Sequence, residues 1–144
     1  MKTLEEKMNN PKEPEVKVLK RQMGNNFPAG RMLIATPKTV ASEIRLIRKG
    51  KVKTIAQIRG QLAKKYKADY TCPITTGIFL RIVAEHAEQQ RSRGVKRIAP
   101  YWRVVQRDYS LNPKLPGGIR AQAKRLRADG VKLEQRGSNF KVGE

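Results

Sequence analysis

Hydrophobic side chains recur at helical spacing in four segments of the chain. In the first of these, Val40, Ile44 and Ile47 follow one another at i, i+4 and i+7, which predicts a helix from Pro37 to about Arg48. Three further helices are predicted from Thr54, from Thr75 or Thr76 to about Gln90, and from Gly118 to Asp129. Their inward-facing residues are expected to be Ile55, Ile58 and Leu62, then Ile78, Ile82 and Val83, and finally Ile119, Ala123 and Leu126.

Short strands accompany these helices. Residues 131–134 and 139–142 flank Arg136-Gly137-Ser138, which is typical of a hairpin. Ile98–Val105 has the apolar character of a strand. Short helices, one of them placed to enter a DNA groove, followed by a terminal hairpin, predict a mainly α-helical domain with small β elements, of the winged-helix DNA-binding type.

We expect this domain to span residues 32–144. Prolines, glycines and asparagines interrupt residues 1–31, which therefore favour a basic, partly disordered extension. Residues 16–19 are apolar enough to pair or pack, but the pattern assigns them no regular structure.

Charge indicates the class of partner. The 144 residues include 32 Lys and Arg against 12 Asp and Glu, a formal net charge of +20. Residues 1–31 hold seven basic and four acidic side chains, which leaves a net charge of +17 on the predicted domain. Such an excess repels itself in a compact state unless a polyanion faces it, so the composition favours nucleic acid over a merely soluble basic surface.

Other classes of function are disfavoured. No apolar run approaches the roughly 20 residues that span a membrane, and the first thirty residues lack a signal-peptide core. One cysteine and one histidine exclude an intramolecular disulfide and a Cys- or His-based metal centre, so neither metal nor cofactor is expected. These features predict a monomeric cytoplasmic protein associated with the nucleoid.

The segment Ile98-Ala99-Pro100-Tyr101-Trp102-Arg103-Val104-Val105 resembles the active-site segment I-P-C-H-R-V-V of the alkylguanine-DNA alkyltransferases. Three further segments are similar to that family in order and spacing, so that the resemblance covers about residues 37–133; they are Lys49–Ile58, Leu115–Gly118 and Asp129-Gly130. The resemblance implies binding of duplex DNA through the minor groove with the third predicted helix, at the N-terminal residues Thr75, Thr76 and Gly77.

Both chemical residues of the family's motif are replaced. Tyr101 stands where the family has its nucleophilic cysteine, and Trp102 stands where it has the activating histidine. A phenol beside an indole, which has only an N–H donor, cannot replace a thiolate and its base. The base-rotating tyrosine of the family falls at Ile55, and its inserted arginine falls near Thr75 or Thr76. The resemblance therefore implies an alkyltransferase-like, non-enzymatic protein that recognises alkylated or distorted DNA and hands it to other repair proteins.

Each candidate site residue also has an ordinary structural interpretation. Tyr101 and Trp102 would stack on a base or fill a redundant core cavity, while Arg103 would support the strand. Thr54, Thr75 and Thr76 would cap helices, and Asn112 would contact phosphate or only form a turn. Gly117 and Gly118 would permit a close backbone approach to a ligand or a tight turn; together with Ile55 and Gly77, these residues form the predicted DNA and base pocket.

Two rival functions remain open. The chain could be a sequence-independent nucleic-acid binder, architectural or RNA-directed, that kept the fold and lost the pocket. Alternatively, Cys72, just before a helix N-terminus among positive charges, could be a relocated alkyl acceptor, although a lone cysteine is more often a small buried apolar residue. Asp129 is expected only to end a helix, and His86 to be a solvated or half-buried residue.

Overall fold

The structure of the protein is a computed structural model that describes residues 2–143. Within those residues the α-helices are α1 (Leu4–Met8), α2 (Pro37–Arg45), α3 (Ile55–Lys65), α4 (Pro73–Ser92) and α5 (Gly118–Ala128), and a 3₁₀ turn, η1, covers Tyr101–Arg103. The strands are β1 (Glu15–Leu19), β2 (Gly30–Ile34), β3 (Lys53–Thr54), β4 (Tyr70–Thr71), β5 (Val104–Val105), β6 (Leu133–Arg136) and β7 (Asn139–Val142).

Threonine side chains start two of the helices, as the sequence predicts. The hydroxyl of Thr36 accepts from the backbone N–H of Thr39 at 3.2 Å, and that of Thr54 accepts from Gln57 at 3.1 Å. The Gln57 side chain in turn accepts from the Thr54 backbone N–H at 2.8 Å, which completes a capping box. Thr54 is buried, so its role is to begin α3.

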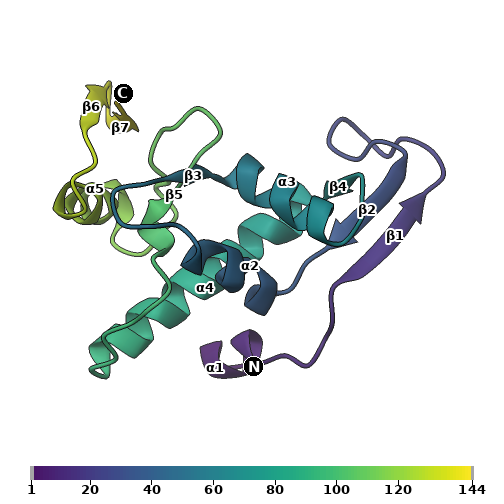
Figure 1. Ribbon diagram of the computed structural model, residues 1–144, viewed down its shortest axis with the longest axis horizontal. Coiled ribbons are helices and arrows are strands. Elements are labelled where there is room, and N and C mark those ends of the chain that lie inside the picture. The colour runs from purple at the N-terminus through teal and green to yellow at the C-terminus, as the bar shows by residue number, and fades with distance from the viewer. Residues whose placement is uncertain (1, 144) are drawn as a thin grey trace.

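The strands form three small sheets at separate places along the molecule. β1 pairs antiparallel with β2, which pairs parallel with β4; β3 pairs parallel with β5; and β6 and β7 form the predicted terminal hairpin. Figure 1 shows the β1–β2 hairpin at one end of the molecule and the β6–β7 hairpin at the other.

Two regular elements lie within the segment that the sequence pattern treats as an extension: α1 at Leu4–Met8 and β1 at Glu15–Leu19, which includes the residues 16–19 that were apolar enough to pair. The predicted boundary between residues 31 and 32 lies inside β2. Val16 packs against the core from β1, and five residue pairs join β1 to β2. Three of the five side chains of β1 are apolar, but that pattern alone does not show that β2 is its partner.

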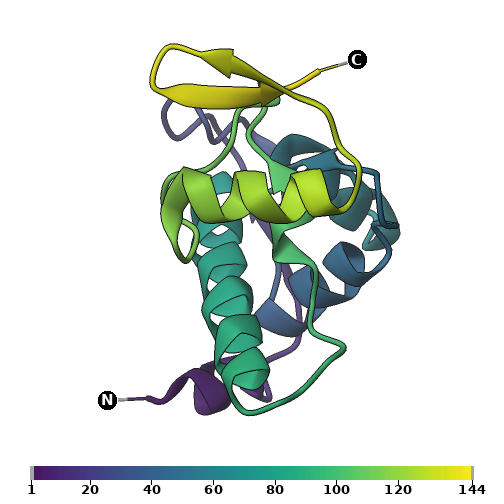
Figure 2. The same cartoon turned by 90° about the vertical axis from the view of Figure 1, so that its left-hand side faces the viewer.

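The main core lies between α2, α3 and α4. Leu33, Ile44, Ile58 and Leu62 are almost fully buried there, and Val83 contributes from α4. A second apolar cluster joins α5 to the C-terminal hairpin through Leu111, Leu126 and Val131, among others. η1 packs against both α4 and α5, and Figure 2 shows α5 crossing α4 in this region.

Two local predictions are wrong. The segment Ile98–Val105 is a 3₁₀ turn followed by a two-residue strand, since the N–H of Arg103 donates to the carbonyl of Pro100 at 3.1 Å. Ile78 is 51% exposed where an inward position was predicted. Val83 is buried as predicted; α4 begins at Pro73, and its buried stripe runs through Thr76, Leu80, Val83, Ala84 and Ala87.

None of the helices in residues 2–143 combines the length and the apolar character needed to cross a bilayer.

Candidate nucleic-acid interface

α3 and α4 form a helix-turn-helix, with residues 66–72 as the turn, and the first turns of α4 carry the candidate interface. Ile74 and Ile78 project into solvent there, 58% and 51% exposed. Gly77 and Arg81 share this face, because positions 74, 77, 78 and 81 lie on one side of a helix. The helix therefore presents an apolar ridge ended by a positive charge.

The neighbouring threonines play a different part. Thr76 is fully buried, and its hydroxyl donates to the Cys72 carbonyl at 2.7 Å. The Thr75 hydroxyl oxygen is also buried, with no hydrogen-bond partner among the described residues. The Thr76 side chain is thus an internal support of α4, and its hydroxyl does not reach the surface where a DNA contact was predicted.

A cleft of about 440 Å³ opens beside this ridge. One wall is the exposed face of α4, and the other is the segment between β5 and α5; the lining residues are Ile74, Gly77, Ile78, Arg81, Gln106, Asn112, Pro113 and Lys114. The ionisable side chains among them are all basic. Of the predicted site residues, the structure brings Gly77 and Asn112 together at this cleft.

Asn112 also shapes the cleft wall. Its side-chain oxygen accepts from the Lys114 backbone N–H at 3.0 Å, and its own N–H donates to Gln122 at 2.9 Å. Gln122 is buried and donates to the carbonyls of Trp102 and Val104, at 3.0 and 2.9 Å. One glutamine thereby ties the cleft wall to η1, a role that the sequence does not indicate because polar residues on α5 are numerous.

Tyr101 lies in the core, 2% exposed. Its hydroxyl donates to Oε2 of Glu88 at 2.7 Å, and the same oxygen accepts from Arg125 at 2.8 Å. Burial and the adjacent carboxylate raise the pKa of Tyr101 far above its usual range. In this conformation Tyr101 therefore faces the packed core and Glu88 and lines no open pocket.

Trp102 is half-buried and packs against both apolar clusters. Its ring meets that of Tyr101 edge to face, with centroids 5.5 Å apart. The Arg125 guanidinium lies 4.5 Å from the Trp102 ring centroid. Trp102 is consequently engaged by protein side chains, and only part of its surface reaches solvent.

Arg103 and Asp129 form a half-buried ion pair beneath Trp102. Arg103 Nε donates to Asp129 Oδ2 at 2.7 Å, and Arg103 also donates to the Ile47 carbonyl at 2.9 Å. The supporting role predicted for Arg103 is confirmed. Burial alone would raise the pKa of Asp129, but hydrogen bonds from Arg103 and Trp102 outweigh it and lower that pKa. The sequence led us to expect that Asp129 only ends a helix. Its hydrogen bonds with Trp102 and Arg103 correct that expectation.

The remaining predicted residues are structural in their contacts. Ile55 packs against the main core. Gly117 has φ +78°, and an added Cβ would lie 2.5 Å from Ala121 Cβ, so glycine is required by the turn that begins α5. Gly118 also has a positive φ, +71°, with open space around its Cα.

Cys72 and His86, the single cysteine and the single histidine of the sequence, lie apart in the part of the chain that the structure describes. Cys72 is 5% exposed, and His86 lies fourteen residues further along, roughly 20 Å away by helical rise. His86 Nε2 lies 2.8 Å from Oε2 of Glu5, so its partner is α1. Within residues 2–143, no group of three or more His, Cys, Asp or Glu could hold a metal ion.

The overall structure is similar to S. pombe Atl1 in its crystal structure with damaged DNA containing O6-carboxymethylguanine. The TM-score is 0.50 at 18% sequence identity, over 74% of this chain and 87% of Atl1. The chain has the fold of an alkyltransferase-like protein. S. pombe ATL in complex with DNA matches with a TM-score of 0.47, 18% identity and the same coverage. No family model and no curated protein matches the sequence.

This likeness confirms the mainly α, winged-helix-like fold predicted from the sequence. In the alkyltransferase-like fold of this chain, α3 and α4 are the helix-turn-helix and β6–β7 is the hairpin wing.

Proposed function

We propose that the protein binds duplex DNA through the exposed face of α4 and recognises alkylated or distorted DNA without chemical turnover. The observation that carries this proposal is the fold shared with Atl1, whose crystal structure contains damaged DNA. The position of the ridge agrees with it, because the N-terminal part of the second helix of a helix-turn-helix is the part that enters a groove.

Charge supports DNA as the ligand. The chain carries a formal net charge of +20, and the ionisable residues lining the α4 cleft, Arg81 and Lys114, are both basic. Each neutralised phosphate releases counterions and so contributes favourably to binding at low salt. A duplex with its closely spaced phosphates is the partner that relieves such self-repulsion.

The ridge also suits the minor groove. Apolar side chains such as isoleucine are used as wedges between base steps by proteins that bind there. Ile74 and Ile78 lie one helical turn apart and have Gly77 between them, which lets the helix approach closely. We therefore propose that α4 docks in the minor groove. Ile74 would then take the place of the inserted arginine, which the family resemblance puts near Thr75 or Thr76.

The absence of turnover is part of the proposal. Cys72 is buried, and both motif positions, Tyr101 and Trp102, are held by Glu88 and Asp129. A sensor without chemistry must pass its lesion on, so we propose that other repair proteins act next and that the protein works as a monomer near cytoplasmic DNA.

A second function is favoured by one observation. Tyr101 is 2% exposed, so the position of the family's nucleophile is closed to a base in this conformation. A protein that binds DNA irrespective of lesions needs no such opening. The alternative is therefore a sequence-independent architectural binder that uses the same ridge and the same basic cleft.

Fluorescence anisotropy with matched duplexes, one plain and one carrying an O6-alkylguanine, separates these functions. Titrations are repeated at several salt concentrations. We expect tighter binding of the alkylated duplex, and a log–log salt slope near −0.9 for each phosphate contacted. Equal affinity for both duplexes would support the architectural function, whereas an affinity that does not change with salt would contradict nucleic-acid binding.

A further inference from the structure

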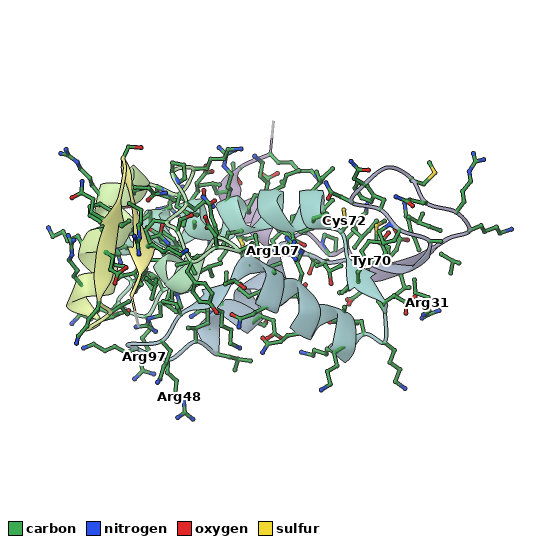
Figure 3. All side chains as sticks on the ribbon, turned by 90° about the horizontal axis from the view of Figure 1, so that it is seen from above. Arg31, Arg48, Tyr70, Cys72, Arg97 and Arg107 are labelled. Atoms are coloured by element: carbon green, nitrogen blue, oxygen red, sulfur yellow. The ribbon has the colours of Figure 1, made fainter. Side chains whose placement is uncertain are left out.

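A second cleft, of about 790 Å³, lies on the other side of the first turn of α4. Arg59 and Lys64 line it from α3, Tyr70 from β4, and Arg107 from the segment after β5; Asn26 contributes from the β1–β2 hairpin loop. Figure 3 labels Arg107 and Tyr70 in this region. These elements come from distant parts of the sequence.

Two arginines in this cleft lack an acidic partner. Neither Arg59 nor Arg107 forms an ion pair with a carboxylate among residues 2–143. Both arginines line the same cleft, and burial, followed by the charge of Arg107, lowers the pKa of Arg59. The acidic residue in the lining, Asp69, accepts from the Arg31 backbone N–H at 2.8 Å.

The β1–β2 hairpin is hydrogen-bonded to β4, whose residues line this cleft. Met32 and Leu33 of β2 pair with Tyr70 and Thr71 of β4. The Tyr70 hydroxyl donates to the Pro28 carbonyl at 2.9 Å, which holds the hairpin loop. Residues 16–31 contain four basic side chains and no acidic one, so the loop continues the positive surface of the cleft.

The two clefts meet at one helical turn. Pro73 lines the second cleft and Ile74 the first; in the same way Arg107 lines the second and Gln106 the first. The two clefts are therefore neighbours, and a duplex bound to the exposed face of α4 would reach Arg107 and Arg59 if it extended towards the β1–β2 hairpin. Guanidinium groups match phosphate geometry and bind it with two parallel hydrogen bonds.

We propose that Arg59 and Arg107 together bind a backbone phosphate of the DNA, and that the β1–β2 hairpin extends the footprint beyond α4. The proposal rests on the DNA binding proposed above. It assigns the N-terminal residues, which the sequence pattern treats as an extension, to the interface. A phosphate between the two guanidiniums replaces their mutual repulsion with attraction to a shared anion.

The test is the double variant Arg59→Gln/Arg107→Gln in the full chain. We expect affinity for plain and alkylated duplexes to fall together, about tenfold or more, because charged hydrogen bonds to a phosphate are lost. The salt slope should become shallower by about one. The control is Arg48→Gln/Arg97→Gln, which removes the same charge from residues that line neither cleft and lie apart from Arg107 and Tyr70 in Figure 3.

Equal losses for the two double variants would overturn the proposal, because net charge alone would then explain the effect. Absence of DNA binding by the wild-type protein would be the separate failure of the proposed function, and it would overturn this inference too. Arg107→Gln alone changes an exposed residue, so it provides the same comparison if the double variant unfolds.

Neutral phosphates locate the contact. In a series of duplexes with a single methylphosphonate, one position should weaken binding of the wild-type protein while leaving the Arg59→Gln/Arg107→Gln variant unaffected. A series in which every position weakens both proteins equally would contradict a phosphate site between these arginines.

Discussion

The indole N–H of Trp102 donates to Oδ2 of Asp129 at 3.0 Å, and that oxygen also accepts from Arg103, 2.7 Å away. Two consecutive residues of η1 are thus anchored to the C-cap of α5 by one carboxylate. The motif position that carries a base in the alkyltransferases has become part of a structural clamp in this chain.

Asp129→Asn should destabilise the fold by about 1–3 kcal/mol, because a charged acceptor shared by two donors is lost. Since the pKa of Asp129 is lowered in the folded state, its contribution is present above the ordinary carboxyl pKa. This stabilising contribution is lost as the pH falls through the pKa that Asp129 has in the folded protein. Thermal unfolding from pH 7 to pH 3 should show a wild-type advantage that shrinks in acid.

Glu134→Gln is the control for this prediction. Glu134 pairs with Arg136 on β6, and both side chains are more than half exposed. Its loss should change stability little, as is usual for exposed ion pairs. If Asp129→Asn lowered the stability by the same amount at every pH, a stabilising role for the charged Asp129 carboxylate would be contradicted.

Tyr101→Ala should cost about 3–5 kcal/mol of stability, since it truncates a buried aromatic residue. Tyr101→Phe removes only the hydrogen bond to Glu88 and should cost about 1 kcal/mol. Affinities for plain and alkylated duplexes, measured below the unfolding temperature, should change together. A stable Tyr101→Ala variant that loses only its preference for the alkylated duplex would indicate base stacking instead.

Ile74→Gln should weaken duplex binding by about tenfold while leaving the thermal unfolding temperature nearly unchanged. An isoleucine that is 58% exposed contributes little to the stability of the fold. Its burial against DNA would remove apolar surface from water, which favours binding. Leu46→Gln is a matched control, as Leu46 is 66% exposed and lines neither cleft. If Ile74→Gln and Leu46→Gln bound the duplex with equal affinity, a DNA contact through the ridge on α4 would be contradicted.

Incubation with O6-alkylguanine duplex should leave the protein mass unchanged. Cys72 is 5% exposed and has no histidine beside it, so a reactive thiolate is not supported. Cys72→Ala should bind both duplexes as the wild type does. An alkyl adduct found on Cys72 by peptide mass spectrometry would revive the transfer function.

Periodicity and capping determined much of the fold. α2, α3, α5 and the β6–β7 hairpin lie near their predicted positions, because each depends on contacts between residues a few positions apart. The mainly α winged-helix class follows from these elements in order. The motif around Pro100 likewise pointed to the alkyltransferase-like fold without any three-dimensional information.

Only the tertiary structure decided which motif residues face solvent. Tyr101 is closed in by Glu88 and Arg125, which are thirteen and twenty-four residues away in the chain, and no local pattern indicates such partners. The exposure of Ile74 and Ile78 follows from the start of α4 at Pro73, which sets the angular position of every later residue. The second cleft, which Arg59 and Arg107 line, likewise requires the parallel pairing of β2 with β4. That pairing is a non-local contact whose stability comes from the packed core.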